Sequence, residues 1–149
     1  MKEKLSWLLP GITVLLLDRA VKLLCQGVTR PLIPGVIGLN WVQNTGMALG
    51  LLQDHPLLIL LVSLALAGFA VWELRAFKPQ GLARVSLSLI AGGALSNMID
   101  RAVYGSVLDM LELLFMRFYI FNVADIGVVA GAILCGLSLL FRPQDWRKQ

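Results

Sequence analysis

Charged and amide side chains occur in short clusters within otherwise apolar stretches of the chain. The three clusters are Asp18 with Lys22, Asn97 with Asp100 and Arg101, and Asn122 with Asp125. The spacing of i and i+4 puts Asp18 and Lys22 on one face of a helix, where they can pair. Ionisable groups in apolar, bilayer-length segments are costly, so they are candidates for function by default.

The chemistry that this inventory supports is carboxylate chemistry. His55 is the only histidine, so a Ser-His-Asp triad lacks a base near these clusters, and the spacing of Cys25 and Cys135 suits neither a metal site nor a disulfide framework. No glycine-rich phosphate loop or dinucleotide motif is present. The remaining candidates are four acids: Asp100, Asp109, Glu112 and Asp125. Two close carboxyl groups share one proton and can activate water against an amide without a cofactor or metal.

Four apolar stretches must position these groups. They cover about residues 5–24, 56–77, 82–104 and 123–141, each close to the roughly 20 residues that cross a bilayer as a helix. Hydrophobic residues make up 58% of the 149-residue chain and charged residues 15%, and mean hydropathy is +0.79. This composition argues against a soluble enzyme and against disorder.

Basic residues predict how the spans are oriented. Eight flank the N-terminus, the connection between the second and third spans, and the C-terminus, whereas the other two connections hold only Arg30 and Arg117. The positive-inside rule therefore places both termini in the cytoplasm. Residues 26–55 and 105–121 are then extracytoplasmic, and the three polar clusters converge on the outer leaflet. The net charge of +4 is interpreted as a topology signal rather than as a nucleic-acid-binding surface.

The two extracytoplasmic segments differ in pattern. Residues 36–42 are rich in β-forming side chains and predict a small sheet-like platform, with Trp41 as an interfacial anchor. Residues 47–52 predict a short surface helix, and residues 105–120 an amphipathic flap on the lipid boundary. The expected fold is a single all-α membrane domain over residues 1–149, with four transmembrane helices and this platform.

Five stretches resemble, in order, the motifs of lipoprotein signal peptidase (signal peptidase II). They are Asp18-x-x-x-Lys22, Asn44-Thr-Gly46 through Gly50, Gly92-Gly93-Ala94-x-x-Asn97-x-x-Asp100-Arg101, Val107-x-Asp109, and Phe121-Asn122-x-Ala124-Asp125. Each motif alone is weak, but five in order with four spans are specific. One departure is Ser96, which stands where the family motif has a glycine before the asparagine.

The resemblance implies an aspartic endopeptidase of the bacterial cytoplasmic membrane. It would remove the signal peptide from diacylglyceryl-modified prolipoproteins just before the lipidated Cys, with globomycin as an expected inhibitor. The matching motifs imply that Asp109 and Asp125 are catalytic. They also imply that substrate is bound by Asn44, Asn97, Arg101 and Asn122, and that structural support comes from Asp18, Lys22 and Asp100. The expected enzyme needs no metal or cofactor, contacts membrane lipid but no nucleic acid, and is a monomer.

Other interpretations remain open from the sequence. A small proton-coupled transporter could use the buried acids as relay groups, and a non-catalytic lipoprotein-binding subunit could keep the pocket without the activity. Asp18–Lys22 and Asp100–Arg101 could be structural ion pairs, and Glu112 a solvated loop charge near Asp109.

Overall fold

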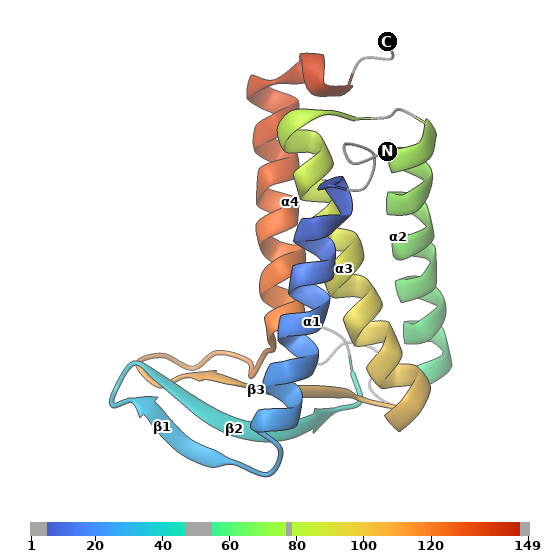
Figure 1. Ribbon diagram of the computed structural model, residues 1–149. Coiled ribbons are helices and arrows are strands. Elements are labelled where there is room, and N and C mark those ends of the chain that lie inside the picture. The colour runs from blue at the N-terminus through green and yellow to red at the C-terminus, as the bar shows by residue number, and fades with distance from the viewer. Residues whose placement is uncertain (1–5, 47–54, 77–78, 147–149) are drawn as a thin grey trace.

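The computed structural model describes residues 6–46, 55–76 and 79–146 and contains four long helices above a small sheet (Figure 1). The helices are α1 (Leu9–Leu24), α2 (Pro56–Ala76), α3 (Gly81–Tyr104) and α4 (Val123–Phe141). The strands are β1 (Thr29–Ile33), β2 (Ile37–Asn44) and β3 (Val107–Leu113). Short 3₁₀ helices, η2 (Ser6–Leu8) and η4 (Pro143–Trp146), precede α1 and follow α4. The sheet lies at one end of the bundle, at the end of α1 and the start of α4.

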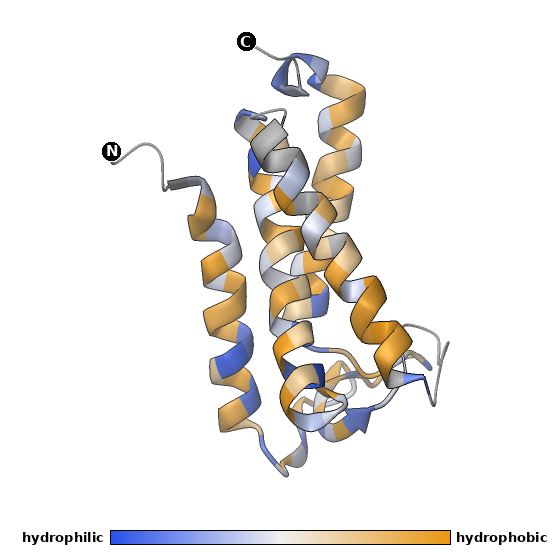
Figure 2. Ribbon diagram, turned by 90° about the vertical axis from the view of Figure 1, so that its right-hand side faces the viewer, coloured by the Kyte–Doolittle hydropathy of each residue, from blue (hydrophilic) through white to orange (hydrophobic). Residues whose placement is uncertain are grey.

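The four helices coincide with the four apolar stretches of the sequence, to within four residues at each end. Their ends have local causes: α3 ends at Gly105, which adopts a left-handed φ of 71°, and Asn122 caps the start of α4. In length and composition, α3 and α4 meet the requirement for crossing a bilayer. Apolar colouring runs along all four helices in Figure 2, with a hydrophilic patch near the sheet end of α1.

Helix α3 is the centre of the bundle and contacts each of the other three helices. Two adjacent glycines allow this close packing. A Cβ on Gly92 would overlap the backbone of Gly11 in α1, and one on Gly93 would overlap the carbonyl oxygen of Ala124 in α4. Residues without a large side chain therefore permit close helix contact behind the polar groups.

The N-terminus of α3 is capped by η4. Gln80, at the N-cap of α3, offers no side-chain cap. Asp145 of η4 supplies one instead, because its carboxylate accepts from the Leu82 N–H at 3.0 Å and its carbonyl accepts from the Gln80 N–H at 3.0 Å. An acid at this position also opposes the positive end of the helix dipole.

The sheet is antiparallel in the order β1-β2-β3. Asn44 is opposite Val107 and Val42 is opposite Asp109, and a bulge lies between Leu39 and Val42 of β2. Because side chains two residues apart share a face, Asn44 and Asp109 are diagonal neighbours across the strand pair. This register brings the side chains of Asn44 and Asp109 close enough to interact.

The third strand differs from the prediction for residues 105–120. Residues 107–113 form a strand of the platform rather than a lipid-boundary flap, and residues 107–110 are all buried. Their burial has a physical reason: the strand lies between β2 and the isolated bridge from Leu111 to Phe121, and it also contacts α1 and α3. The predicted surface helix over residues 47–52 lies outside the described residues.

Candidate active site

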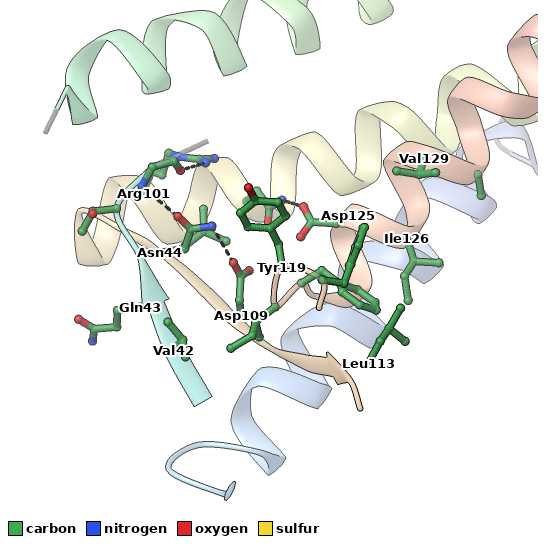
Figure 3. A pocket seen from close by; sticks show the side chains of 18 of the residues that line it. Val42, Gln43, Asn44, Arg101, Asp109, Leu113, Tyr119, Asp125, Ile126 and Val129 are labelled. Carbon is green, nitrogen blue, oxygen red and sulfur yellow. Dashed lines mark hydrogen bonds between the residues drawn. The ribbon is translucent and has the colours of Figure 1, made fainter. Parts of the chain in front are cut away.

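A pocket of about 720 Å³ lies where α3, α4 and the sheet meet. Its polar end is formed by Asn44, Asn97, Arg101, Asp109 and Asp125, and α4 contributes an apolar wall of Ile126, Val129, Ala130 and Ile133. Figure 3 shows Asp109 from β3 and Asp125 from α4 on the wall of the same pocket. Two elements that are separate in sequence thus bring two carboxyl groups to one cavity.

Asp109 is held by two amide donors. Its Oδ2 accepts from Asn44 Nδ2 at 2.8 Å and its Oδ1 accepts from Asn122 Nδ2 at 2.7 Å. The side chain is almost fully buried, with 2% of its surface exposed. Burial raises the pKa of Asp109 to about 6; the charge of Asp125 adds to this increase, and the bonds from Asn44 and Asn122 oppose it.

Asp125 occupies the first turn of α4 and forms a reciprocal capping box with Asn122. The Asn122 side chain accepts from the Asp125 N–H at 2.8 Å, and Asp125 Oδ2 accepts from the Asn122 N–H at 3.1 Å. The other oxygen, Oδ1, accepts from Asn97 Nδ2 at 2.7 Å. The carboxyl group is therefore fixed to both α4 and α3.

Asn122 is the physical link between the two acids. Its backbone N–H bonds Asp125, and its side-chain Nδ2 donates to Asp109 and, at 3.0 Å, to Asn97 Oδ1. Asn122 is fully buried and does not line the pocket. Both polar atoms of this side chain have partners within the protein, and the substrate-binding role expected for Asn122 stays a prediction.

Asp18 and Asp100 each hold the backbone immediately before one of the pocket acids. Asp18 Oδ1 accepts from the N–H of Ala124, next to Asp125, at 3.0 Å. Asp100 Oδ2 accepts from the N–H of Leu108, next to Asp109, at 3.1 Å. Both carboxylates are fully buried.

Lys22 connects these two supports. Its Nζ lies 2.6 Å from Asp18 Oδ2 and 2.6 Å from Asp100 Oδ2, and it donates to Asn97 Oδ1 at 3.4 Å. With Lys22 and Asn122 both donating to its oxygen, Asn97 must turn its amide nitrogen towards Asp125. The ion pair from Asp18 to Lys22 follows the predicted i, i+4 spacing.

The predicted pair between Asp100 and Arg101 is not formed. These neighbours point in different directions: Asp100 binds Arg19 and Lys22, whereas Arg101 lines the pocket and donates to the Gly46 carbonyl at 3.3 Å. Consecutive helical residues are about 100° apart, so one can be buried while the next faces a cavity. Glu112 stands outside the pocket lining and accepts from Asn40 at 3.2 Å.

Two parts of the site were not assigned from sequence. Arg19 and Ser96 belong to the buried network around Asp18 and Asp100. Position 19 lies at a variable position of its motif, and Ser96 replaces the motif glycine. The apolar wall of α4 was also missed, although its members recur at positions 126, 129, 130 and 133. That spacing places the four residues on one helix face, so the sequence could have predicted an apolar surface next to Asp125.

The arrangement suits acid–base chemistry. The four carboxylate oxygens of Asp109 and Asp125 each accept at least one N–H, and both groups border a largely apolar cavity, where charge interactions are strong. Among residues 6–46, 55–76 and 79–146, no group of three or more His, Cys, Asp or Glu side chains could hold a metal ion.

Solved structures with a similar fold are available for comparison. One, described as a bacterial membrane enzyme structure by the in meso method at 2.3 Å resolution, has a TM-score of 0.86 and 24% identity, covering 97% of this chain and 93% of that one. A second, described likewise at 1.9 Å resolution, has a TM-score of 0.78 and 25% identity, covering 92% and 94%. The bundle with its sheet at one end is therefore a fold that bacterial membrane enzymes adopt.

Sequence comparisons agree with this fold. The "Lipoprotein signal peptidase" of Pelotomaculum thermopropionicum is 39% identical over 135 residues, covering 85% of this chain and 86% of that protein. The protein of the same name from Streptococcus pneumoniae is 37% identical over 134 residues, covering 89% and 88%. The family model for signal peptidase (SPase) II matches residues 11–141. The chain therefore belongs to the signal peptidase II family.

Proposed function

We propose that this chain is an aspartic endopeptidase that cleaves the signal peptide from diacylglyceryl-modified prolipoproteins just before the lipidated Cys. The observation that carries the proposal is the placement of Asp109 and Asp125 on one pocket, linked through Asn122. Family membership supports the substrate class. The reaction needs no cofactor, because the two carboxyl groups supply both acid and base.

In the proposed mechanism the dyad holds one proton. The ionised carboxylate takes a proton from a water molecule, whose oxygen attacks the peptide carbonyl carbon while the protonated carboxyl gives its proton to the carbonyl oxygen. Collapse of the tetrahedral intermediate breaks the C–N bond, and the proton taken from water passes to the leaving nitrogen. One hydroxyl of the intermediate returns its proton to the carboxylate that had protonated the carbonyl oxygen, so the carboxylic acid product forms and the dyad again holds one proton. The pKa of Asp109, raised to about 6 chiefly by burial, suits proton exchange near neutral pH. The two acids titrate as a coupled pair.

Other pocket residues receive roles from their positions. Arg101, Asn44 and Asn97 line the polar end of the pocket and would bind the peptide backbone or the lipid-bearing end of the substrate. Asn122 would position both acids instead. Asp18, Lys22 and Asp100 would fix the backbone that carries the acids.

The apolar wall suggests how a lipidated substrate reaches the acids. Ile126, Val129 and Ile133 line the pocket yet remain 48%, 57% and 57% exposed. This face of α4 would be open to acyl chains, so the substrate would enter laterally from the bilayer. We place all four helices across the bacterial cytoplasmic membrane, with both termini in the cytoplasm, the dyad at the outer leaflet and the protein as a monomer.

A proton-coupled transporter finds no support. Such a protein needs ionisable relay groups along a path through the membrane, whereas the buried residues of α4 beyond Asp125 are Gly127, Gly131 and Ser138, none of which has an ionisable side chain. The relatives that the chain resembles are peptidases by name.

The test is cleavage of a purified diacylglyceryl-modified prolipoprotein by the purified protein. Asp109→Asn and Asp125→Asn should each lower kcat by about 10³-fold or more while the protein remains folded, because an amide cannot exchange the proton. Glu112→Gln is the matched control, since this acid lies on the same strand as Asp109 but outside the pocket lining, and it should cleave normally. Globomycin should inhibit the active proteins. Normal processing by either aspartate variant would refute the dyad.

A further inference from the structure

A buried charge cluster lies behind the dyad, between α1 and α3. Asp18 and Asp100, both fully buried, share the single ammonium group of Lys22, whose Nζ is 2.6 Å from an oxygen of each. Two carboxylates with one lysine would leave a net negative charge inside the protein. An uncompensated buried charge is strongly destabilising.

Arg19 supplies the missing positive charge. Its Nη2 lies 2.6 Å from Asp100 Oδ1 and 3.3 Å from Asp18 Oδ2, so it contacts both acids. With Arg19 and Lys22 together, the four-residue cluster is neutral. The side chain of Arg19 is 26% exposed, whereas that of Lys22 is 3% exposed, so Arg19 closes the outer side of the cluster.

Ser96 fixes Arg19 in this position. Arg19 Nε donates to Ser96 Oγ at 3.1 Å and Nη2 donates to the Ser96 carbonyl at 3.2 Å. The same hydroxyl donates to Asp18 Oδ2 at 2.7 Å. A glycine here, as in the family motif that the sequence resembles, would retain the carbonyl contact and lose both hydroxyl bonds. The serine therefore ties Arg19 to the carboxylate that it neutralises.

The cluster controls the two backbone segments on which the dyad is built. Asp18 accepts the N–H of Ala124, and Asp100 accepts the N–H of Leu108. An ionised carboxylate accepts such bonds more strongly than a protonated one. Any change that displaces the carboxylate of Asp18 or Asp100 therefore acts on the residue next to Asp125 or Asp109.

We infer that Arg19, anchored by Ser96, is a positioning residue that holds the carboxylates of Asp18 and Asp100 in place and so keeps Asp125 and Asp109 in register for catalysis. The inference rests on the proposed peptidase function. The charged groups that surround the cluster and the dyad are Lys22 on α1, Asp100 and Arg101 on α3, Asp125 on α4 and Asp109 on β3. Arg19 does not line the pocket, so its effect must pass through these groups.

The test compares Arg19→Gln with the wild-type protein in the prolipoprotein cleavage assay. Loss of the charge should lower kcat by about tenfold, because small displacements of reacting groups are costly, and leave KM within about twofold, because Arg19 is outside the pocket. The pH optimum should move upward by about 0.5 unit, because loss of a nearby positive charge favours the protonated form of Asp109.

Three further variants make the result specific. Arg19→Lys keeps the charge but not the planar fork, so it should restore the pH optimum while kcat recovers only in part. Ser96→Gly should shift the optimum in the same direction as Arg19→Gln, and the double variant should be no worse than Arg19→Gln alone. Arg30→Gln removes a positive charge from exposed β1 and should change neither kcat nor the optimum.

An unchanged pH optimum in Arg19→Gln, or a fall in thermal stability without any change in kcat, would overturn the inference. A second readout does not depend on cleavage: NMR titration of ¹³C-labelled aspartate carboxyl groups, with Asp109→Asn used for assignment, should show the pKa of Asp109 rising in Arg19→Gln. An unshifted Asp109 titration overturns the positioning role even if Arg19→Gln fails to cleave. If the wild-type protein does not cleave prolipoprotein, while the pKa of Asp109 still rises in Arg19→Gln, the proposed function is refuted and the positioning role is not.

Discussion

At the scale of single residues, the site is built from neutral amide donors around negative acceptors. Asn44, Asn97 and Asn122 each donate from a side-chain nitrogen to the carboxylate of Asp109 or Asp125. An asparagine carries one acceptor and two donors, so the direction of its amide is set by its other contacts. The contact from Lys22 fixes the orientation of the Asn97 amide. The Gly46 N–H, which donates to Asn44 Oδ1 at 2.9 Å, fixes the orientation of the Asn44 amide.

Asn122 combines a structural and a positioning task, and two substitutions separate them. Asn122→Ser keeps an oxygen that can cap α4, whereas Asn122→Ala loses the cap, worth about 1 kcal/mol. The alanine variant should therefore unfold about 2–4 °C below the serine variant. Both lose the amide that holds Asp109, so both should cleave about 100-fold more slowly.

Thermal melting and cleavage assays on the same preparations check this expectation. Asn40→Ser is the control, because Asn40 bonds Glu112 outside the pocket and should leave cleavage unchanged. Near-normal cleavage by Asn122→Ser would show that the amide is not needed to place Asp109.

Asn44 should influence the pH dependence of cleavage. Its hydrogen bond favours the charged form of Asp109 and therefore holds the pKa of about 6 below the value that burial alone would give. In Asn44→Ala the pKa of Asp109 should rise, and the pH optimum of kcat should move upward by about 0.5–1 unit. A profile measured from pH 4 to 9 checks this, and an optimum that stays in place or moves to lower pH contradicts it.

The residues of the site were predictable to different degrees. Asp18, Lys22, Asn97, Asp100, Asn122 and Asp125 stand out because polar groups in an apolar stretch are rare. Arg19 and Ser96 were not assigned a role, since a network between α1 and α3 depends on how the two helices face each other. The helix period alone does not fix that rotation.

At the scale of elements, the close approach of α3 and α4 places Asp125. A Cβ at Gly93 would overlap the Ala124 carbonyl oxygen, one residue before Asp125. Gly93→Ala should therefore destabilise the protein by about 1–3 kcal/mol and reduce cleavage, because the first turn of α4 must move away from Asn97.

Gly136→Ala is the matched control on α4, because a Cβ there meets no described atom within 4 Å. This control should melt at or above the wild-type temperature, since alanine favours a helix interior over glycine. Melting curves and cleavage rates decide the comparison, and equal behaviour of the two variants would mean that the glycine contact does not position Asp125.

Elements also show where sequence patterns stop being informative. The helices were predicted closely because apolar length is a property of one segment. Strand β3 was missed because residues 107–110 are buried on both faces and show no alternation, and its partner β2 lies more than 60 residues earlier in the chain. Such long-range pairing leaves little trace in a single local window.

At the scale of the whole molecule, the thirteen Lys and Arg residues fall into three groups. Eight flank one predicted side of the spans, two the other, and Arg19, Lys22 and Arg101 belong to the site at the sheet end of the bundle. Because α1 begins and α4 ends away from the sheet (Figure 1), the structure and the positive-inside rule together predict an extracytoplasmic sheet.

Cysteine labelling in bacterial cells tests this orientation. In a Cys25→Ser/Cys135→Ser background, Thr29→Cys places a thiol on exposed β1 and Gln144→Cys places one on exposed η4, and neither changes a charge. A membrane-impermeant maleimide added to cells with a permeable outer envelope should label Thr29→Cys directly. It should label Gln144→Cys only after the cytoplasmic membrane is opened, because charged reagents do not cross the bilayer. Both variants should still cleave prolipoprotein, which shows that the labelled protein is folded. The reverse labelling pattern would place the dyad in the cytoplasm, where a substrate anchored in the outer leaflet could not reach it.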